Sequence, residues 1–478
     1  MIWRGNPAVR AAALISALLS FAALARAADD AESLARQGDG FLKDRNIPAA
    51  IEAYRKATLL KPDLEKAHEG LMTALADAGK LDEAARECEE LLRRNAKEPK
   101  FHRDYAAILY RQGKLEDSIG EMNEALRLNP DSIPARRELA SLLMRNSRFS
   151  EAEALWAEAI QRHPQDADMH NQYGVVLARR GDSRASIVSF ETALKYNPEH
   201  ADALYNLGFA RLNLWQLPQA ISVLQKAIAA NPKNSDAYYH LARAYARSDK
   251  LPEAMEYLEQ AIRMKNDSGD YHVEMGRLLV QLHRDRQAIG EFTEVFRHDP
   301  QNVEAHSLLG QALMREGQMN MAIPQFRAVL AKRPDDALTY RELAVCFAGT
   351  GQTEDAIIYY REALRIRPES PEAMNGLAWL LATDPDPKIR NGEEALKLAN
   401  AALKLSSTRR ADYLDTLAAA QAENGKCAEA LKTIKSAIEV AKSTGDEKAV
   451  KDLESRIKTF TEGKPHRRGG VPTTQATR

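Results

Sequence analysis

The chain repeats itself every 34 residues over most of its length. Proline recurs at this spacing, for example as Pro130, Pro164, Pro198 and Pro232. When each unit is numbered from the position of Ala201, proline occupies position 32, alanine recurs at position 20 and glycine at position 15. Three residue types in one shared register cannot be accidental. A fixed period of this length indicates an array of small structural units that stack on one another.

Each unit is predicted to be two helices joined by a tight turn. In the unit 201–234, apolar residues at positions 4, 7, 8 and 11 lie on one face of a first helix. Glycine at position 15 suits the left-handed backbone of a sharp turn, and Gly208 at position 8 lets the second helix approach closely. Proline at position 32 cannot continue the second helix, so Asn197–Pro198 marks a boundary between units.

This pattern resembles the tetratricopeptide repeat family, whose units are antiparallel helix pairs stacked into a right-handed superhelix. The resemblance implies an all-α solenoid of about twelve repeats over 31–444, closed by a C-terminal capping helix at 445–462. The unit 371–410 carries about five extra residues around "DPDPKIRNG", which should lengthen its inter-helix turn. The basic tail 463–478 is rich in Gly, Pro and Thr, and is expected to be disordered.

Residues 1–27 have the features of a secretory signal peptide. Arg4 and Arg10 provide a basic start, residues 11–24 are apolar, and the sequence "ARA" ends the segment with small residues at the cleavage positions. The apolar run is too short to span a bilayer comfortably. We therefore expect cleavage after Ala27 and a periplasmic or secreted protein, with an uncleaved anchor as the alternative.

Composition and motifs argue against several classes of function. A net charge of −1 gives no electrostatic reason to expect nucleic acid or an anionic membrane as partner. Cys88, Cys346 and Cys427 are few and far apart, which indicates structural thiols. The sequence contains no phosphate loop, nucleophile elbow or HExxH motif, and the repeats leave no room for a catalytic domain. We expect no enzyme activity, cofactor, metal site or nucleic-acid partner.

Histidine recurs at position 4 of five first helices, at the expected seam between repeats. These residues are His68, His102, His170, His272 and His306. Stacked repeats lie too far apart for neighbouring rings to share one metal ion. Packing at the seam is the expected role, and a pH-sensitive seam is the alternative.

In the family that the chain resembles, positions 5, 9, 12 and 13 of the first helix line a concave groove that holds partners. Here those positions are rich in arginine, amides and aromatic residues. They include Arg137, Asn171, Arg179, Tyr205, Phe209, Asn213, Tyr239, Arg243, Arg247, Arg277, Gln281, Gln311, Arg315 and Arg341, with Arg103 and Asn375 at the two ends. Simple solvation of an exposed helix face is the alternative explanation.

These residue types favour a non-catalytic interaction scaffold of the cell envelope. Arginine binds carboxylates with two parallel hydrogen bonds, and aromatic side chains are enriched at recognition surfaces. The expected partner is an extended, acid-bearing segment of another protein lying in the groove. The alternative is an accessory role in polymer export or envelope assembly, in which the same residues bind a polyanionic polysaccharide. The lysine and asparagine clamp that some family members use for C-terminal carboxylates is not reproduced.

Overall fold

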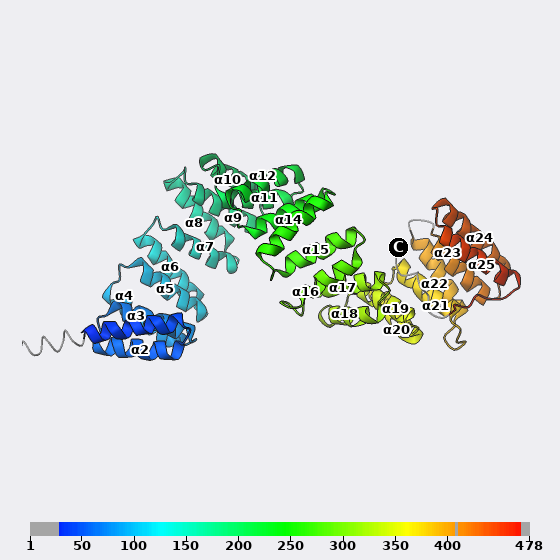
Figure 1. Ribbon diagram of the computed structural model, residues 1–478, viewed down its shortest axis with the longest axis horizontal. Helices are drawn as coiled ribbons and strands as arrows, with labels where there is room; N and C mark the ends of the chain where they lie inside the picture. Colours follow the sequence, from blue (N-terminus) through cyan, green and yellow to red (C-terminus); the bar gives the residue numbers. More distant parts are fainter. Residues whose placement is uncertain (1–27, 407–409, 470–478) are drawn as a thin grey trace, which may run out of the picture. The chain divides into compact units, whose positions relative to one another are not determined.

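A computed structural model describes residues 28–406 and 410–469 (Figure 1). Within these ranges the regular secondary structure is helical, and the predicted all-α repeat fold is confirmed. The predicted signal peptide and residues 470–478 of the predicted tail lie outside the described residues. The right-handed superhelix stays a prediction. In the parts of the chain that are described, no helix is both long and apolar enough to cross a membrane.

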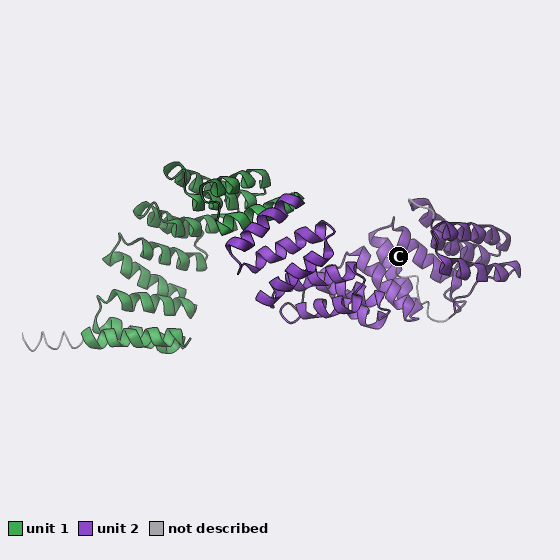
Figure 2. Cartoon of the chain, turned by 45° about the horizontal axis from the view of Figure 1, so that its top comes forward, with its two compact units in different colours: residues 1–216 green, residues 217–478 purple. Residues whose placement is uncertain are grey.

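The chain divides into two compact units, Met1–Gln216 and Leu217–Arg478 (Figure 2). The N-terminal unit contains a helix at 28–43, α2 (Ile47–Leu60), α3 (Glu65–Asp77), α4 (Leu81–Arg94), α5 (Pro99–Arg111), α6 (Leu115–Leu128), α7 (Ile133–Arg145), α8 (Phe149–Arg162), α9 (Ala167–Arg180), α10 (Ser183–Tyr196) and α11 (Ala201–Asn213).

The C-terminal unit contains α12 (Leu217–Ala230), α13 (Ser235–Arg247), α14 (Leu251–Met264), α15 (Gly269–Gln281), α16 (Asp285–Val295), α17 (Val303–Arg315), α18 (Met319–Lys332), α19 (Ala337–Gly349), α20 (Thr353–Ile366), α21 (Pro371–Thr383), α22 (Gly392–Leu405), α23 (Ala411–Glu423), α24 (Cys427–Ser443) and α25 (Glu447–Thr461). Each of the twelve predicted repeats supplies two of the described helices, and α25 follows as the predicted cap.

Successive first helices contact one another within each unit. This holds for α7, α9 and α11 in the N-terminal unit, and from α13 through α23 in the C-terminal unit. The first helices are therefore neighbours in space as well as in the repeat order. We call the surface that they line in each unit its first-helix face.

The inter-helix turns show why glycine recurs at position 15. Gly79, Gly181 and Gly351, like the other glycines at this position, have φ angles in the left-handed region, between +73° and +96°. Where the repeat lacks glycine, the residue at position 15 still adopts this conformation, as Ser147 (φ 61°) and His283 (φ 58°) do. The left-handed conformation costs a non-glycine residue about 1 kcal/mol or more. These residues adopt it nevertheless, because the turn between the two helices requires it.

Glycine at position 8 makes room for an aromatic ring from the second helix of the same repeat. A Cβ atom added to Gly310 would lie 2.7 Å from Cε1 of Phe326, whose side chain is fully buried. Gly174 and Phe190 form the equivalent pair in the N-terminal unit, where the added atom would lie 2.6 Å from the ring. The predicted close approach of the two helices is observed in these repeats.

Position 4 of the first helix joins a repeat to the one before it. Nε2 of His272 lies 3.0 Å from the carbonyl oxygen of Asn266, and Nδ1 lies 2.8 Å from Oε2 of Glu291. His68 and His102 make the same two kinds of contact. The hydrogen bond with Glu291 raises the pKa of His272. Packing at the seam, as expected for these histidines, is therefore observed.

Arginine replaces histidine at position 4 in one repeat and makes the same connection. Arg136 is 3% exposed, and its Nη2 donates to the carbonyl oxygen of Pro130 at 2.5 Å. Its Nη1 donates to the carbonyl oxygen of Leu155 at 2.8 Å. Two chemically different side chains thus satisfy the same backbone carbonyl at the end of the preceding repeat.

The repeat 371–410 departs from the others as predicted. Its inter-helix loop occupies residues 384–391, whereas the preceding repeat uses only residues 350–352 for the same turn. Arg390 fixes the long loop by donating to the carbonyl oxygens of Asp384 and Pro385 at 2.8 and 2.9 Å.

The start of the tail is ordered against this loop. Arg468 Nη2 lies 2.7 Å from Oδ2 of Asp384, and the backbone N–H of Arg468 donates to the carbonyl oxygen of Thr383 at 3.0 Å. The prediction of disorder from residue 463 onwards is therefore wrong for this part of the tail. Composition suggested disorder because it carries no information about a buried carboxylate elsewhere in the chain.

Candidate partner-binding surface

The predicted groove residues of the N-terminal unit differ in accessibility. Arg137, Arg179 and Asn213 are exposed, whereas Tyr205 and Phe209 are half-buried. Asn171 is only 1% exposed, and its Oδ1 accepts a hydrogen bond from Asn206 Nδ2 at 2.9 Å. This amide contact joins α9 to α11. Asn171 was therefore wrongly predicted as a partner contact, because its polar group serves the packing of neighbouring first helices.

In the C-terminal unit, all the predicted groove residues keep some accessible surface. Arg277, Gln281 and Arg315 are exposed. Tyr239, Arg243, Arg247, Gln311 and Arg341 are half-buried.

Several of the predicted arginines already have carboxylate partners within the chain. Arg277 forms an ion pair with Glu304. Arg315 Nε lies 2.7 Å from Oδ1 of Asp285. A partner carboxylate would have to displace these internal acids, so the arginines of the first-helix face are not equivalent as binding groups.

Tyr239, Tyr271, Arg243 and Arg247 form a cation–aromatic cluster, which we call the α13 patch. The rings of Tyr239 and Tyr271 are stacked with centroids 4.8 Å apart, and the Arg243 guanidinium carbon lies 5.5 Å from the Tyr239 centroid. Burial raises the pKa of Tyr239 to about 12. Burial and the nearby charge of Arg243 lower the pKa of Arg247. An anion placed here would relieve the repulsion between the two guanidinium groups.

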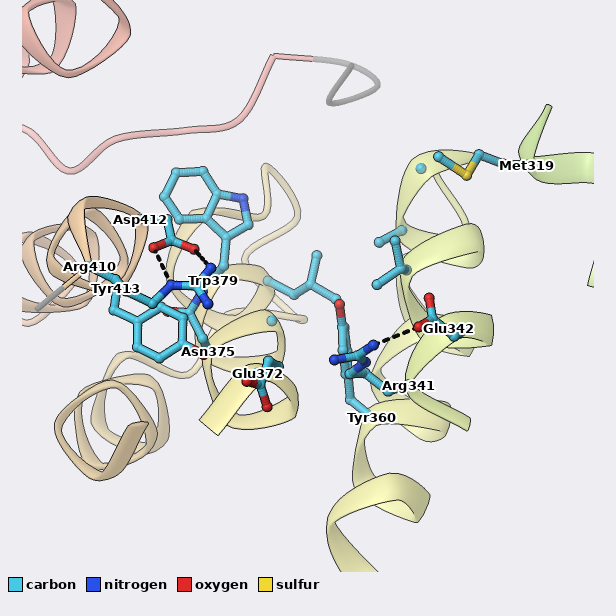
Figure 3. Close-up of a pocket in the computed structure, with 15 residues that line it drawn as sticks. Met319, Arg341, Glu342, Tyr360, Glu372, Asn375, Trp379, Arg410, Asp412 and Tyr413 are labelled. Atoms are coloured by element: carbon cyan, nitrogen blue, oxygen red, sulfur yellow. Dashed lines mark hydrogen bonds and ion pairs between the residues drawn. The ribbon is translucent and has the colours of Figure 1, made fainter. Parts of the chain in front are cut away.

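A pocket opens between three consecutive first helices, α19, α21 and α23 (Figure 3). It offers about 210 Å³, which is below the range of about 300–1,000 Å³ typical of small-molecule sites. It is lined by Met319, Arg341, Glu342, Val345, Ala348, Gly349, Tyr360, Glu372, Asn375, Gly376, Trp379, Leu380, Arg410, Asp412 and Tyr413. Its size suits one or two side chains of a peptide.

Three residues that line this pocket each carry a buried polar atom that has no hydrogen-bond partner among the described residues. These atoms are Arg341 Nε, Trp379 Nε1 and Asn375 Oδ1. Trp379 is 8% exposed, and the nitrogen edge of its indole faces the pocket (Figure 3). A buried polar group without a partner costs about 1–3 kcal/mol. The set contains two donors and one acceptor, which matches the carbonyl and N–H groups of an extended peptide backbone.

Ion pairs on either side hold the walls of the pocket. Arg410 donates two hydrogen bonds, of 3.0 and 2.7 Å, to the carboxylate of Asp412. Its guanidinium carbon lies 4.6 Å from the ring centroid of Tyr413. Arg341 Nη2 lies 2.6 Å from Oε1 of Glu342 on the opposite wall. The polar groups of both walls are thus fixed before a ligand arrives.

Sequence reasoning found only part of this pocket. Arg341 and Asn375 were among the predicted groove residues, whereas Trp379, Arg410 and Tyr413 were missed, although Trp379 occupies groove position 9 of its unit. Arg410 immediately precedes α23 and therefore lies outside the first-helix positions of the repeat. The signal that could have identified the pocket is Trp379, since few tryptophans occur in the chain.

The described residues offer no metal centre. They contain no group of three or more His, Cys, Asp and Glu side chains that could hold a metal ion. Cys88 and Cys346 are buried, and burial raises the pKa of the Cys346 thiol to about 12. These thiols pack in the core and are protonated at neutral pH.

Comparison with known proteins establishes the family. Tetratricopeptide repeat models match residues 109–172 and 216–282, and also 70–133, 177–214, 273–320, 317–371 and 350–410. The chain belongs to the tetratricopeptide repeat family. Proteins of this family are protein–protein interaction scaffolds, generally without catalytic activity. Among curated proteins, no sequence matches the chain.

Solved structures include several with similar repeats. YrrB, described as a TPR protein with an unusual peptide-binding site, is 25% identical, with 39% of this chain and 95% of that chain covered and a TM-score of 0.36. MamA RS-1 is 27% identical over 34% of this chain and 93% of its own, with a TM-score of 0.32. Yeast Tom70 is 17% identical over 90% of this chain and 96% of its own, with a TM-score of 0.34. We draw no functional conclusion from these likenesses, because all three TM-scores are below 0.5.

Proposed function

We propose that this chain is a non-catalytic scaffold of the cell envelope that holds an extended segment of a partner protein on the first-helix face of its C-terminal unit. The observation that carries this proposal is the pocket between α19, α21 and α23, where three buried polar atoms lack partners. A repeat array is suited to such a segment because each repeat adds a few contacts to a ligand that lies across several of them.

The pocket supplies contacts to the backbone of the bound segment. Arg341 Nε and Trp379 Nε1 would donate to its carbonyl oxygens, and Asn375 Oδ1 would accept from one of its N–H groups. One side chain of the segment would fill the space beside Tyr360 and Leu380. The mechanism is binding alone: the repeats stay folded, and the partner segment becomes ordered on them.

The α13 patch supplies contacts to acidic side chains of the segment. Arg243 and Arg247 are brought together on one turn of α13, and Tyr239 provides a flat apolar surface beside them. The combination also suits the carboxylates and sugar rings of a uronic-acid polysaccharide. We keep this as the second candidate, and its dependence on salt distinguishes it from a peptide.

A displayed library of random twelve-residue peptides, selected on the full chain, tests the proposal. The dissociation constant of the best peptide is then measured for the wild type and for Asn375→Leu, which keeps the side-chain size but removes the acceptor. One lost hydrogen bond of about 1 kcal/mol weakens binding about fivefold. Asn400→Leu is the matched control, because Asn400 is exposed on the second helix α22 and donates to the carbonyl oxygen of Leu396 in the same helix.

Two results contradict the proposal. One is a library that yields no peptide binding more tightly than about 1 mM. The other is a selected peptide that binds Asn375→Leu as tightly as it binds the control. Either would mean that the three unpartnered atoms do not mark a peptide site.

A further inference from the structure

Residues 464–469 lie against the repeats, and we call them the C-terminal strap. Arg468 forms an ion pair with Asp384, in which Nη2 lies 2.7 Å from Oδ2. The same nitrogen also contacts Oγ1 of Thr353 at the start of α20. These partners precede Arg468 by 84 and 115 residues, so the strap reaches back over two repeats.

The two residues before Arg468 are also held. Arg467 Nη1 lies 2.5 Å from Oε2 of Glu423, at the end of α23. The ring of His466 packs against the indole of Trp379, with centroids 5.8 Å apart and planes inclined by 42°. Three consecutive side chains of the strap thus contact one aromatic group and two carboxylates.

The ion pair between Arg468 and Asp384 is almost fully buried. The two side chains are 10% and 4% exposed, whereas those of Arg467 and Glu423 are 34% and 14% exposed. A buried carboxylate that loses its cation is strongly destabilised. Without Arg468, the one hydrogen bond to the Asp384 carboxylate from the described residues would be that of the Asp386 backbone N–H at 2.9 Å. The loop 384–391 therefore presents an acid that requires a cation from outside the repeat.

The long loop of the repeat 371–410 creates this site. Asp384 directly follows the last residue of α21, and the loop then turns away under the control of Arg390, which also binds Glu423 at 2.8 Å. One Glu423 oxygen thus faces the loop and the other faces the strap. A short inter-helix turn of the usual length could make neither the loop contact nor the strap contact. The extra residues of the loop and the basic residues of the tail thus serve the same site.

We propose that Trp379, Asp384 and Glu423 form a recognition site for an extended basic segment of the type His-Arg-Arg, which the chain's own residues 466–468 occupy in the free protein. A basic segment of a partner protein takes the place of the strap when it binds. The site is distinct in charge from the α13 patch, which suits acidic groups. The site shares Trp379 with the pocket between α19, α21 and α23, but its carboxylates Asp384 and Glu423 do not line that pocket. The test below therefore depends on these two acids and not on the proposed function.

The strap competes from a short tether. Only residues 462–465 separate α25 from His466, which gives the strap a local concentration in the millimolar range. A peptide in solution at micromolar concentration therefore cannot displace it unless the peptide binds far more tightly. Because of this short tether, the strap occupies the site in the free protein.

The test uses the full chain with Arg467→Ala and Arg468→Ala, which empties the site without shortening the protein. A fluorescent peptide, EGKPHRRG, is titrated into this double variant, the wild type and Lys464→Ala, and anisotropy is recorded. The double variant should bind the peptide at least tenfold more tightly than the wild type. Lys464→Ala should behave as the wild type does, because Lys464 is exposed and its ion pair is with the neighbouring Glu462. Adding Asp384→Asn to the double variant should abolish binding.

Equal binding to all variants would overturn the proposal, as would equal binding of the charge-reversed peptide EGKPHEEG to the double variant. A concentration-dependent dimer of the wild type would show that the strap occupies a second copy, and would overturn occupancy within one chain. Should the double variant unfold, millimolar unlabelled peptide is added to the wild type instead. Hydrogen exchange at the Arg468 amide must then accelerate, and unchanged exchange refutes displacement.

Discussion

Substitution of alanine for glycine should have opposite effects at two helical positions of the C-terminal unit. Gly290 in α16 is exposed, and an added Cβ would meet nothing within 4 Å. Gly310 in α17 is buried, and an added Cβ would lie 2.7 Å from both Cε1 and Cζ of Phe326. Both sites gain the same helix propensity, so the pair isolates the packing of the ring against the first helix.

The expected magnitudes follow from these contacts. Gly290→Ala should increase the free energy of unfolding by about 0.5–1 kcal/mol, because alanine loses less backbone entropy than glycine. Gly310→Ala gains the same amount but must push a fully buried ring, and overpacking a core costs about 1–3 kcal/mol. The two variants should therefore differ by about 1–3 kcal/mol, on the order of 5 °C in Tm.

Circular dichroism during thermal and urea unfolding measures both variants against the wild type. Hydrogen exchange across α17 and α18 reports the local effect, since stability in a repeat array is partly local. Adding Phe326→Leu to Gly310→Ala removes both ring atoms in question and should recover part of the loss. If Gly310→Ala is as stable as Gly290→Ala, the pairing of glycine with an aromatic ring is not what sets the distance between the two helices.

Three further results are expected. The hydrogen bond to Glu291 raises the pKa of His272 in the folded state. The contribution of this bond to the stability of the fold is therefore complete below pH 6.5, the pKa of the unfolded chain, and is lost as the pH rises through the folded-state pKa. Tm measurements should then show a larger loss from His272→Gln at pH 6 than at pH 9, and a loss independent of pH would refute this. The double substitution Arg243→Glu and Arg247→Glu should abolish capture of an acidic peptide without changing Tm, whereas the control Arg263→Glu on α14 should leave capture intact. If the ligand is a polysaccharide, its binding should weaken more steeply with salt than that of a peptide. Sequencing of the mature N-terminus should begin after Ala27, and a chain that begins at Met1 would remove the proposed export.

The repeat architecture was predictable because its determinants are local. Proline at position 32 cannot extend the second helix in the regular way, and position 15 demands a left-handed residue. The structure extends the second rule, because Ser147 and His283 adopt that conformation without being glycine. The tail was not predictable in the same way. Its order depends on Asp384, which is close to Arg468 in space but distant in sequence.

The binding surface was only partly predictable for a related reason. Helix periodicity places Arg277, Arg341 and Asn171 on one side of their helices, but does not say which polar groups are already used. Internal carboxylates bind Arg277 and Arg341, and a neighbouring amide binds Asn171. Periodicity identifies a face, whereas the unpartnered atoms of Trp379 and Asn375 become evident only when neighbouring helices are in place.

The strap also bears on the order in which the chain folds. Repeats that contact only their neighbours can fold as soon as the next helix has been synthesised. Arg468 contacts Thr353, which is made 115 residues earlier, so the C-terminal unit completes its structure only after synthesis has passed the strap. Until then the Asp384 carboxylate lacks its cation. The loop 384–391 is therefore open to other basic segments during synthesis and is closed to them once the strap docks.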